Sequence, residues 1–185
     1  MTDTILTNRD IELRALEPED LEVLFRWENN PDTWHLSNTL APLSRFVLRQ
    51  YLENAHRDIY ETRQLRLVIQ LREENRPLGA IDLFDFDPFH LRAGVGILIA
   101  DRQDRNRGYA GQALETLVRY GFNVLRLHQL YANIGVTNQV SLKLFEKAGF
   151  EITGRKRDWI RVAGGFEDEY IVQRIRSSTM RSSEA

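Results

Sequence analysis

Two periodic patterns of apolar residues follow one another along nearly the whole chain. Apolar residues at every second position predict a half-buried strand, and spacings of three and four predict one face of an amphipathic helix. Strands are expected over residues 11–15, 65–71, 78–86, 94–100, 130–136, 151–162 and 166–175. Helices are expected over residues 18–28, 45–58, 110–125 and 138–149.

The order of these elements predicts a mixed α/β fold, with helices on both faces of one twisted sheet. No internal repeat, low-complexity segment or long linker divides the chain, so we expect a single domain over residues 1–176. The last residues, 177–185, are polar and lack any periodicity. They are expected to form a disordered tail.

Composition restricts the class of protein. Of the 185 residues, 42% are hydrophobic and 28% are charged, which is ordinary for a soluble globular domain. The net charge of −2 gives no basis for a nucleic-acid partner, and the absence of cysteine excludes disulfides and thiol chemistry. His35, His56 and His128 are scattered without the spacing of metal ligands, so no metal site is expected.

The sequence contains no pattern typical of a membrane or secretory segment. No apolar run approaches the ~20 residues that are needed to span a bilayer. The opening residues, MTDTILTN, lack the basic start and apolar stretch of a signal peptide. We therefore expect a cytoplasmic protein without a membrane partner.

The turn Arg105–Ala110 joins an apolar strand to a long amphipathic helix. Free backbone N–H groups at a helix N-terminus form a docking place for phosphate or pyrophosphate. Gly108 would let the backbone approach an anion, and Arg105 and Arg107 would add charged donors at the rim. The alternative is an ordinary strand–turn–helix junction with solvated arginines.

Two other phosphate-binding motifs do not fit. A P-loop requires G-x-x-x-x-G-K-[ST], and the chain contains no such string. Gly94-Val95-Gly96 begins like a dinucleotide-binding fingerprint, but it lies inside the expected strand and the third glycine is replaced by Ile99.

A second block, Asn138–Phe150, reads N-x-x-[SA]-x-x-[LI]-[YF]-x-[KR]-x-G-F, and the turn before it reads R-x-x-G-x-A. In this order, with one helix and one strand between them, the two blocks resemble the GNAT superfamily of N-acetyltransferases. The resemblance covers about residues 11–175. It implies a single GNAT-type domain with a mostly antiparallel sheet, two splayed central strands, and acetyl-CoA as co-substrate.

The resemblance also implies where acetyl-CoA binds. The central strand would pair with the pantetheine amides, the turn would hold the pyrophosphate, and the second block would contact the pantetheine and the thioester. The implied cofactor-binding residues are Ile97, Leu98, Ile99, Arg105, Asn106, Arg107, Gly108, Tyr109, Ala110, Asn138, Ser141 and Phe145. For Asn138 the alternative is a helix N-cap, and Gly149 is assigned to ending the helix.

The implied reaction is direct attack of a substrate amine on the acyl thioester. An alkylamine with a pKa near ~10.4 must first lose a proton, and a thiolate with a pKa of roughly 8.5 leaves more readily once protonated. Many family members supply the second proton from a tyrosine, which is Phe145 here. The glutamate that often stands two residues before the position of Gly96, after an Arg-Ala pair, is Gly94 here, so the usual acid and the usual base are both missing.

Ser141 is the candidate catalytic substitute, because it lies four residues before Phe145 on the same helical face. Its hydroxyl could donate to the thioester sulfur, although a serine in the first helical turn commonly bonds the backbone instead. Candidate bases are Asp82, Asp85, Asp87 and His90. Strict alternation places Asp85 and Asp87 on one face and Asp82 on the other, and each has the alternative of a solvated edge residue.

Three acceptor classes fit the family: a polyamine or diamine, the N-terminus of a ribosomal protein or other peptide, and a small amine such as an amino sugar or an antibiotic. Acidic residues at 82–87 and 167–169 would attract a cation, but they are equally ordinary surface charge. Trp34 and His35 fall in the loop that shapes the acceptor site in this superfamily. The substrate-binding candidates are therefore Trp34, His35, Asp82 and Asp85.

The closing hairpin at residues 151–175 carries more apolar surface than one edge strand needs, including Trp159, Val162 and Phe166. It predicts a homodimer or a larger closed oligomer, unless these side chains only complete the monomer's own core. A function of another class, a non-catalytic acyl-CoA-binding module, stays open because the usual acid and base are missing.

Overall fold

The computed structural model describes residues 5–31, 34 and 41–177, so the expected disordered tail lies outside the described residues except for Ser177. One seven-stranded sheet has the order β1-β2-β3-β4-β5-β7-β6. Its strands are β1 (Ile11–Arg14), β2 (Leu65–Leu71), β3 (Arg76–Asp87), β4 (Arg92–Ile99), β5 (Gln129–Gly135), β6 (Glu151–Val162) and β7 (Gly165–Ile175). The helices are η1 (Pro18–Asp20), α1 (Leu21–Glu28), α3 (Arg45–Glu53), α4 (Ile59–Thr62), η2 (Arg102–Asp104), α5 (Tyr109–Asn123) and α6 (Gln139–Lys147).

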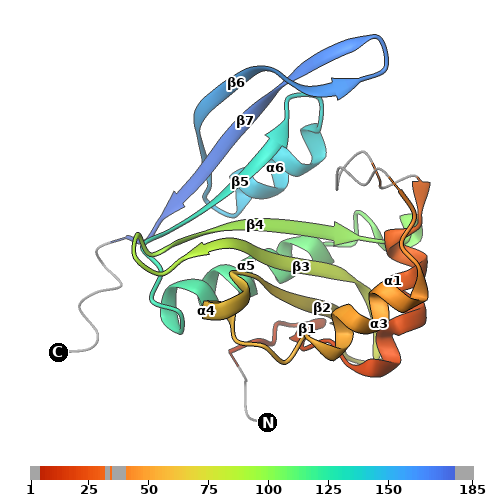
Figure 1. Cartoon of the computed structure of the whole chain (residues 1–185). Helices are drawn as coiled ribbons and strands as arrows, with labels where there is room; N and C mark the ends of the chain where they lie inside the picture. The colour runs from red at the N-terminus through yellow and green to blue at the C-terminus, as the bar shows by residue number, and fades with distance from the viewer. Residues whose placement is uncertain (1–4, 32–33, 35–40, 178–185) are drawn as a thin grey trace, which may run out of the picture.

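All neighbouring strands are antiparallel except β4 and β5, which run parallel. These two strands pair only from Arg92 opposite Gln129 to Gly94 opposite Tyr131. Beyond that point they diverge, and β5, β7 and β6 form an upper wing that is separated from β1–β4 (Figure 1). The expected mixed, mostly antiparallel sheet with splayed central strands is therefore confirmed.

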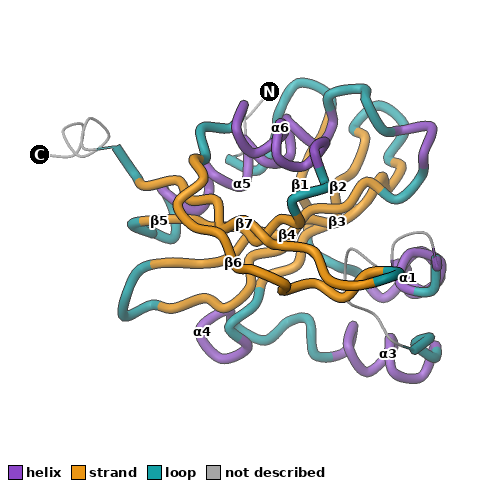
Figure 2. The backbone as a smooth tube through the Cα atoms, turned by 90° about the horizontal axis from the view of Figure 1, so that it is seen from above, coloured by secondary structure: helices purple, strands orange, loops and turns teal. Residues whose placement is uncertain are grey.

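Helices cover both faces of the sheet, as expected. Figure 2 shows α5 and α6 on one side of the sheet and α1 and α3 on the other. We call the side that carries α1 and α3 the open face, because no helix of the described residues lies over β5, β7 and β6 there (Figure 2).

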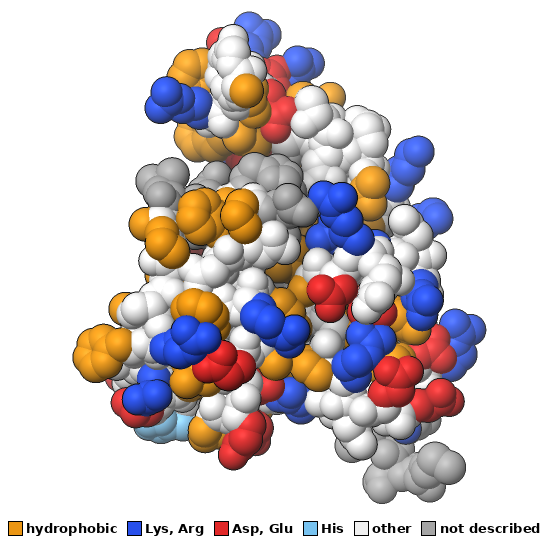
Figure 3. Space-filling view, turned by 90° about the vertical axis from the view of Figure 1, so that its right-hand side faces the viewer, with side chains coloured by type: hydrophobic (Ala, Val, Ile, Leu, Met, Phe, Trp, Pro, Cys, Tyr) orange, Lys and Arg blue, Asp and Glu red, His pale blue; other side chains and the backbone are white. Residues whose placement is uncertain are grey.

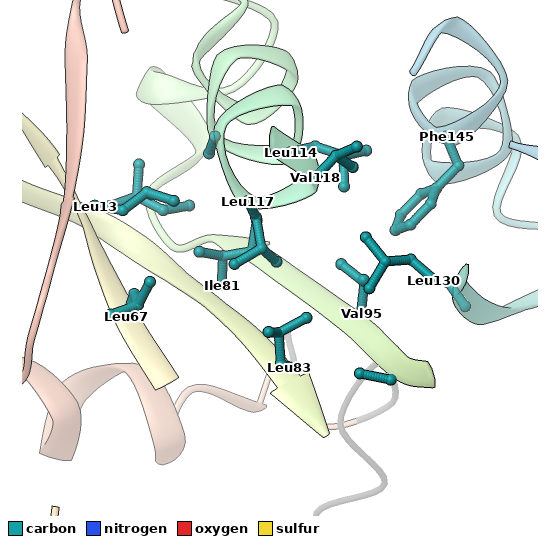
Figure 4. Packing of buried hydrophobic residues seen from close by; sticks show 14 of the residues in the cluster. Leu13, Leu67, Ile81, Leu83, Val95, Leu114, Leu117, Val118, Leu130 and Phe145 are labelled. Carbon is teal, nitrogen blue, oxygen red and sulfur yellow. The ribbon is translucent and has the colours of Figure 1, made fainter. Parts of the chain in front are cut away.

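The main core lies between the sheet and α5. Buried side chains from α5, such as Leu114 and Leu117, meet Ile81 and Leu83 of β3 (Figure 4). A smaller core under α1 and α3 consists of Leu24, Trp27, Leu48, Val68, Ala80 and Ala100. The buried residues of α5 include Leu114, Leu117, Val118, Gly121 and Phe122, at the spacings of three and four that predict an amphipathic helix.

The helix expected over residues 45–58 ends earlier, at Glu53. The side-chain amide and the backbone N–H of Asn54 both donate to the carbonyl of Gln50, at 2.7 and 3.2 Å. The next N–H, of Ala55, donates to the carbonyl of Leu52 at 3.0 Å, so the chain tightens into a turn there. Asp58 then caps the short α4, since its carboxylate accepts from the backbone N–H of Tyr60 at 2.6 Å. The long helix expected to reach residue 125 ends at Asn123.

Candidate functional site

The divergence of β4 from β5 leaves one edge of β4 without a strand partner. Among the described residues, β5 pairs with β4 no further than Gly94, whereas β4 continues to Ile99. Ile97, Leu98 and Ile99, the expected pantetheine contacts, all lie in this unpaired part. An extended chain that carries amides can add to such an edge through main-chain hydrogen bonds.

The turn that follows β4 leads to the N-terminus of α5. Gly108 is the N-cap of α5 and has a φ of 84°, a left-handed conformation that favours glycine. A Cβ built on Gly108 would meet nothing within 4 Å, so the backbone there is open to a ligand. Tyr109 and Ala110 begin the helix, and the N–H groups of a first helical turn have no intrahelical acceptor.

The two arginines of the turn lie in different environments. Arg105 is half-buried, and its guanidinium donates to the carbonyls of Ile99 and Ala100, both at 3.0 Å. It therefore fixes the turn against the end of β4, which differs from the expected position at the rim. Asn106, with a φ of 62°, and Arg107 are exposed beside Gly108.

The second block places its residues along α6. Asn138 caps the helix, because its side-chain oxygen accepts from the N–H of Ser141 at 3.1 Å. Ser141 is half-buried. Phe145 is 3% exposed and packs edge-on against Phe150 with ring centroids 5.0 Å apart. Its ring points from α6 toward Leu130 and Val95, on the inner side of the divergence (Figure 4).

A pocket lies on the open face, where β4 and β5 are still paired. Its volume is about 510 Å³. It is lined by Asp85, Asp87, Arg92, Gln129, Tyr131, Ile171 and Gln173. The hydroxyl of Tyr131 donates to Oδ2 of Asp85 at 3.4 Å. Burial, together with the negative charge of Asp85, raises the pKa of Tyr131, so this tyrosine stays protonated at neutral pH.

The expected separation of Asp82 from Asp85 and Asp87 is wrong. Strand β3 has a bulge between Phe84 and Asp87, and Asp85 adopts a φ of 48° within it. The extra residue shifts the alternation, so that Asp87 shares a face with Asp82 and Phe84. The carboxylates of Asp85 and Asp87 line the same pocket. Backbone N–H donation from His90 lowers the pKa of Asp87, so its carboxylate is ionised.

Asp82 lies outside that pocket and is engaged in an ion-pair network. Nε of Arg66 lies 2.6 Å from Oδ1 of Asp82, and its Nη1 lies 2.7 Å from Oε1 of Glu28. Burial lowers the pKa of Arg66, but the carboxylate of Asp82 more than offsets this, and the net shift is upward. Arg66 therefore remains charged and joins the end of α1 to the sheet.

The acceptor loop is only partly described. The indole Nε1 of Trp34 donates to the carbonyl of Glu28 at 2.8 Å, which places this side chain beside the end of α1. His35, the other candidate in this loop, lies outside the described residues.

The open end of the divergence faces the viewer in Figure 3, with the hairpin of β6 and β7 projecting at the top. Basic and acidic side chains are interspersed on this side, and hydrophobic side chains lie on the projecting hairpin (Figure 3). Trp159 and Phe166 of this hairpin are 60% and 61% exposed. They do not close the core of the described monomer.

The sequence patterns did not single out three residues that lie at or beside the site: Arg66, Phe84 and Tyr131. Tyr131 alternates with the buried Leu130 and Ala132, a pattern that could have placed its ring opposite the core.

Within the described ranges, no three His, Cys, Asp or Glu residues gather as metal ligands. No helix in these ranges is long and apolar enough to cross a membrane.

Comparisons with known proteins agree with this geometry. A family model described as an acetyltransferase (GNAT) domain matches residues 10–151. The chain is 26% identical over 180 residues to the spermidine N(1)-acetyltransferase of Vibrio cholerae, covering 96% of this chain and 99% of that protein. It is 29% identical over 144 residues to the spermidine N(1)-acetyltransferase of Escherichia coli K12, covering 78% and 74% of the two chains.

Solved structures share the fold. The crystal structure of spermidine N-acetyltransferase from Vibrio cholerae in complex with CoA and spermine matches with a TM-score of 0.83 at 23% identity, over 94% of this chain and 99% of that chain. A dodecameric structure of spermidine N-acetyltransferase from Vibrio cholerae matches with a TM-score of 0.76 at 24% identity, over 96% and 100%. The single α/β domain expected from the sequence is thus the fold of known acetyltransferases.

Proposed function

Because the chain belongs to the GNAT family of acetyltransferases and is an N-acetyltransferase, we propose that it transfers the acetyl group of acetyl-CoA to a primary amine of a polyamine or diamine. Membership in an enzyme family sets aside the non-catalytic alternative. The observation that carries the proposal is the unpaired edge of β4, which leads directly into the open N-terminus of α5.

In this proposal the pyrophosphate binds at the start of α5. The first-turn N–H groups and the helix dipole attract the anion, and the exposed Arg107 adds charge. The pantetheine arm extends from there along the unpaired edge between Ile97 and Ile99, toward the point where β4 and β5 meet. This course brings the thioester close to Gly94.

The reaction joins the amine nitrogen to the acetyl carbon and breaks the carbon–sulfur bond. The amine must be unprotonated to attack, and the departing thiolate takes up a proton. Phe145 has no hydroxyl to donate, so we retain Ser141 as the candidate donor. On the acceptor side, Asp85 accepts a hydrogen bond from Tyr131, which lies where β4 and β5 separate, and we propose that it receives or orients the ammonium group.

A cationic acceptor fits the pocket, because its lining carries one more carboxylate than cation. Arg92 lies 3.3 Å from Asp87, so Asp85 is the carboxylate of the pocket that we assign to the acceptor. The matched protein from Vibrio cholerae is named for spermidine, and its crystal structure contains spermine. Asp82 is a weaker candidate, because Arg66 already neutralises its charge.

We also propose a closed homo-oligomer, supported by the exposed Trp159 and Phe166 and by the dodecameric assembly of the matched enzyme. Light scattering tests it, since a single species at the monomer mass of 21.6 kDa would contradict it. A cytoplasmic location stays a prediction.

The substrate class is tested by thiol release from acetyl-CoA in the presence of single amines. The panel contains spermidine, spermine, putrescine, free amino acids and basic N-terminal peptides, and mass spectrometry identifies each product. We expect the highest kcat/KM with an amine that carries two or more positive charges. Preference for a peptide N-terminus would contradict the proposal.

The variant Asp85→Asn tests the acceptor pocket in the same assay. It should raise KM for the polyamine at least tenfold and leave KM for acetyl-CoA unchanged. Glu73→Gln, which removes a carboxylate from the exposed turn between β2 and β3, is the matched control and should change neither constant. A KM for the amine that is equal in the two variants would remove Asp85 from the site.

A further inference from the structure

The ring of Phe84 lies directly on the backbone of Gly94. These residues are opposite one another on β3 and β4. A Cβ added to Gly94 would lie 2.3 Å from Cε2 and 2.4 Å from Cζ of Phe84, closer than any carbon atoms pack. The absence of a side chain at position 94 is therefore what allows the aromatic ring to cover the strand.

Phe84 covers β4 at the vertex of the divergence. Gly94 and Tyr131 form the last residue pair before β4 and β5 separate. The ring of Tyr131 meets the ring of Phe84 edge-on, with centroids 6.0 Å apart and an interplanar angle of 80°. These two rings close the vertex on the open face.

The opposite face of the vertex is also filled. Val95, Leu130 and Phe145 are each buried there in the main core. A chain that enters the divergence from its open end therefore meets packed apolar or aromatic groups on both sides of the vertex. Of these groups, Phe84 is only half-buried, and it belongs to neither core cluster.

We propose that Phe84, seated on Gly94 and supported by Tyr131, sets the length of the acyl group that the enzyme transfers. This inference rests on the proposed course of acetyl-CoA along β4, which directs the acyl group at the vertex. An acetyl group fits in front of the ring, whereas each further methylene must displace it. One methylene typically changes discrimination by roughly 10–200-fold. The transfer is the same for any acyl group: a carbon–nitrogen bond forms and the carbon–sulfur bond breaks.

The test compares acetyl-, propionyl- and butyryl-CoA as donors for the wild type and for Phe84→Ala. The ratio of kcat/KM for butyryl-CoA to that for acetyl-CoA should rise at least about tenfold in the variant. The control is Phe89→Ala, which removes an equal ring at a position that is 86% exposed in the turn after β3. It should leave the ratio unchanged.

A second variant and a binding measurement accompany this comparison. If Phe84→Ala does not fold, Phe84→Leu shortens the side chain with less loss of volume and should shift the ratio in the same direction. Calorimetric dissociation constants for acetyl-CoA and butyryl-CoA should converge in either variant. A wild type that acetylates amines while both variants keep its donor preference would overturn this inference alone. A wild type that neither binds nor uses acetyl-CoA would overturn the proposed function together with it.

Discussion

Arg76 and Asp104 form two parallel hydrogen bonds, with Nη1 2.7 Å from Oδ2 and Nη2 3.0 Å from Oδ1. Asp104 belongs to η2, just before the turn that begins α5, and Arg76 begins β3. The side chain of Asp104 is only 2% exposed. This bidentate pair therefore fixes the segment just before the candidate pyrophosphate turn to the start of β3.

The Asp104 pair predicts an acid-sensitive stability. Hydrogen bonds from Arg76 lower the pKa of Asp104 in the folded protein below its ordinary value of about 3.9. The stability that this shift contributes is present above that value and is lost as the pH falls through the lowered pKa. Asp104→Asn should therefore lie well below the wild type in thermal midpoint at pH 7, and the gap should narrow below about pH 4. Asp101→Asn, at an exposed neighbouring position, is the control, and a constant gap from pH 7 to pH 3 would refute the assignment.

Replacing Gly108 should lower the affinity for acetyl-CoA through backbone strain and not through a steric clash. Valine rarely adopts a φ of 84°, so Gly108→Val should shift the first-turn N–H groups and weaken acetyl-CoA binding at least tenfold. Gly164→Val is the matched control, since Gly164 has a φ of 89° and equally open space in the distant turn between β6 and β7. Calorimetry should separate the two variants. Equal affinities would exclude this turn from the site.

Replacing Arg66 should weaken binding of the acceptor amine without weakening binding of acetyl-CoA. Arg66→Gln leaves the carboxylates of Glu28 and Asp82 without their shared cation, which should cost on the order of 2 kcal/mol of stability. Because Glu28 ends α1 before the acceptor loop, KM for the amine should rise severalfold while KM for acetyl-CoA stays constant. Arg66→Lys should be intermediate, and the exposed Arg49→Gln should resemble the wild type. An equal change in both KM values would indicate general destabilisation instead.

Adding a hydroxyl to the ring of Phe145 on α6 should not reduce the catalytic rate. If departure of the thiolate limits the rate, Phe145→Tyr should be as fast as the wild type or faster. Phe150→Tyr adds the same hydroxyl to the other, equally buried ring of the pair, so it controls for the effect on the core. Steady-state rates normalised to folded protein decide the matter. A more than tenfold loss confined to Phe145→Tyr would show that the site requires an apolar group there.

The fold followed from periodicity and from the resemblance of two sequence blocks, because both depend on local spacing. The bulge at Asp85 did not, since aspartate tolerates a φ of 48° without any change in the apolar pattern. Strict alternation then separated Asp87 from Asp82, whereas the bulge brings the two residues to the same face. The early end of α3 was also missed, because the turn at Asn54 and Ala55 leaves the helical spacing of apolar residues unchanged.

Site residues within one continuous segment could likewise be predicted, and those that depend on contacts between strands could not. The open turn at Gly108 and the edge of β4 could be predicted, because each is one continuous segment. Phe84 and Tyr131 could not be paired in advance, since their contact depends on the register of β3, β4 and β5. Arg105 was expected at the rim, but its guanidinium reaches back to the carbonyl of Ile99.

A crystal structure of the protein with CoA tests the proposed cofactor site most directly. We predict the pyrophosphate at the first-turn N–H groups of α5, beside Gly108, and pantetheine amides paired with the backbone of Ile97–Ile99. The sulfur should lie near Gly94, in front of the ring of Phe84. CoA bound elsewhere, or an edge of β4 left empty at saturating CoA, would contradict the proposed binding site.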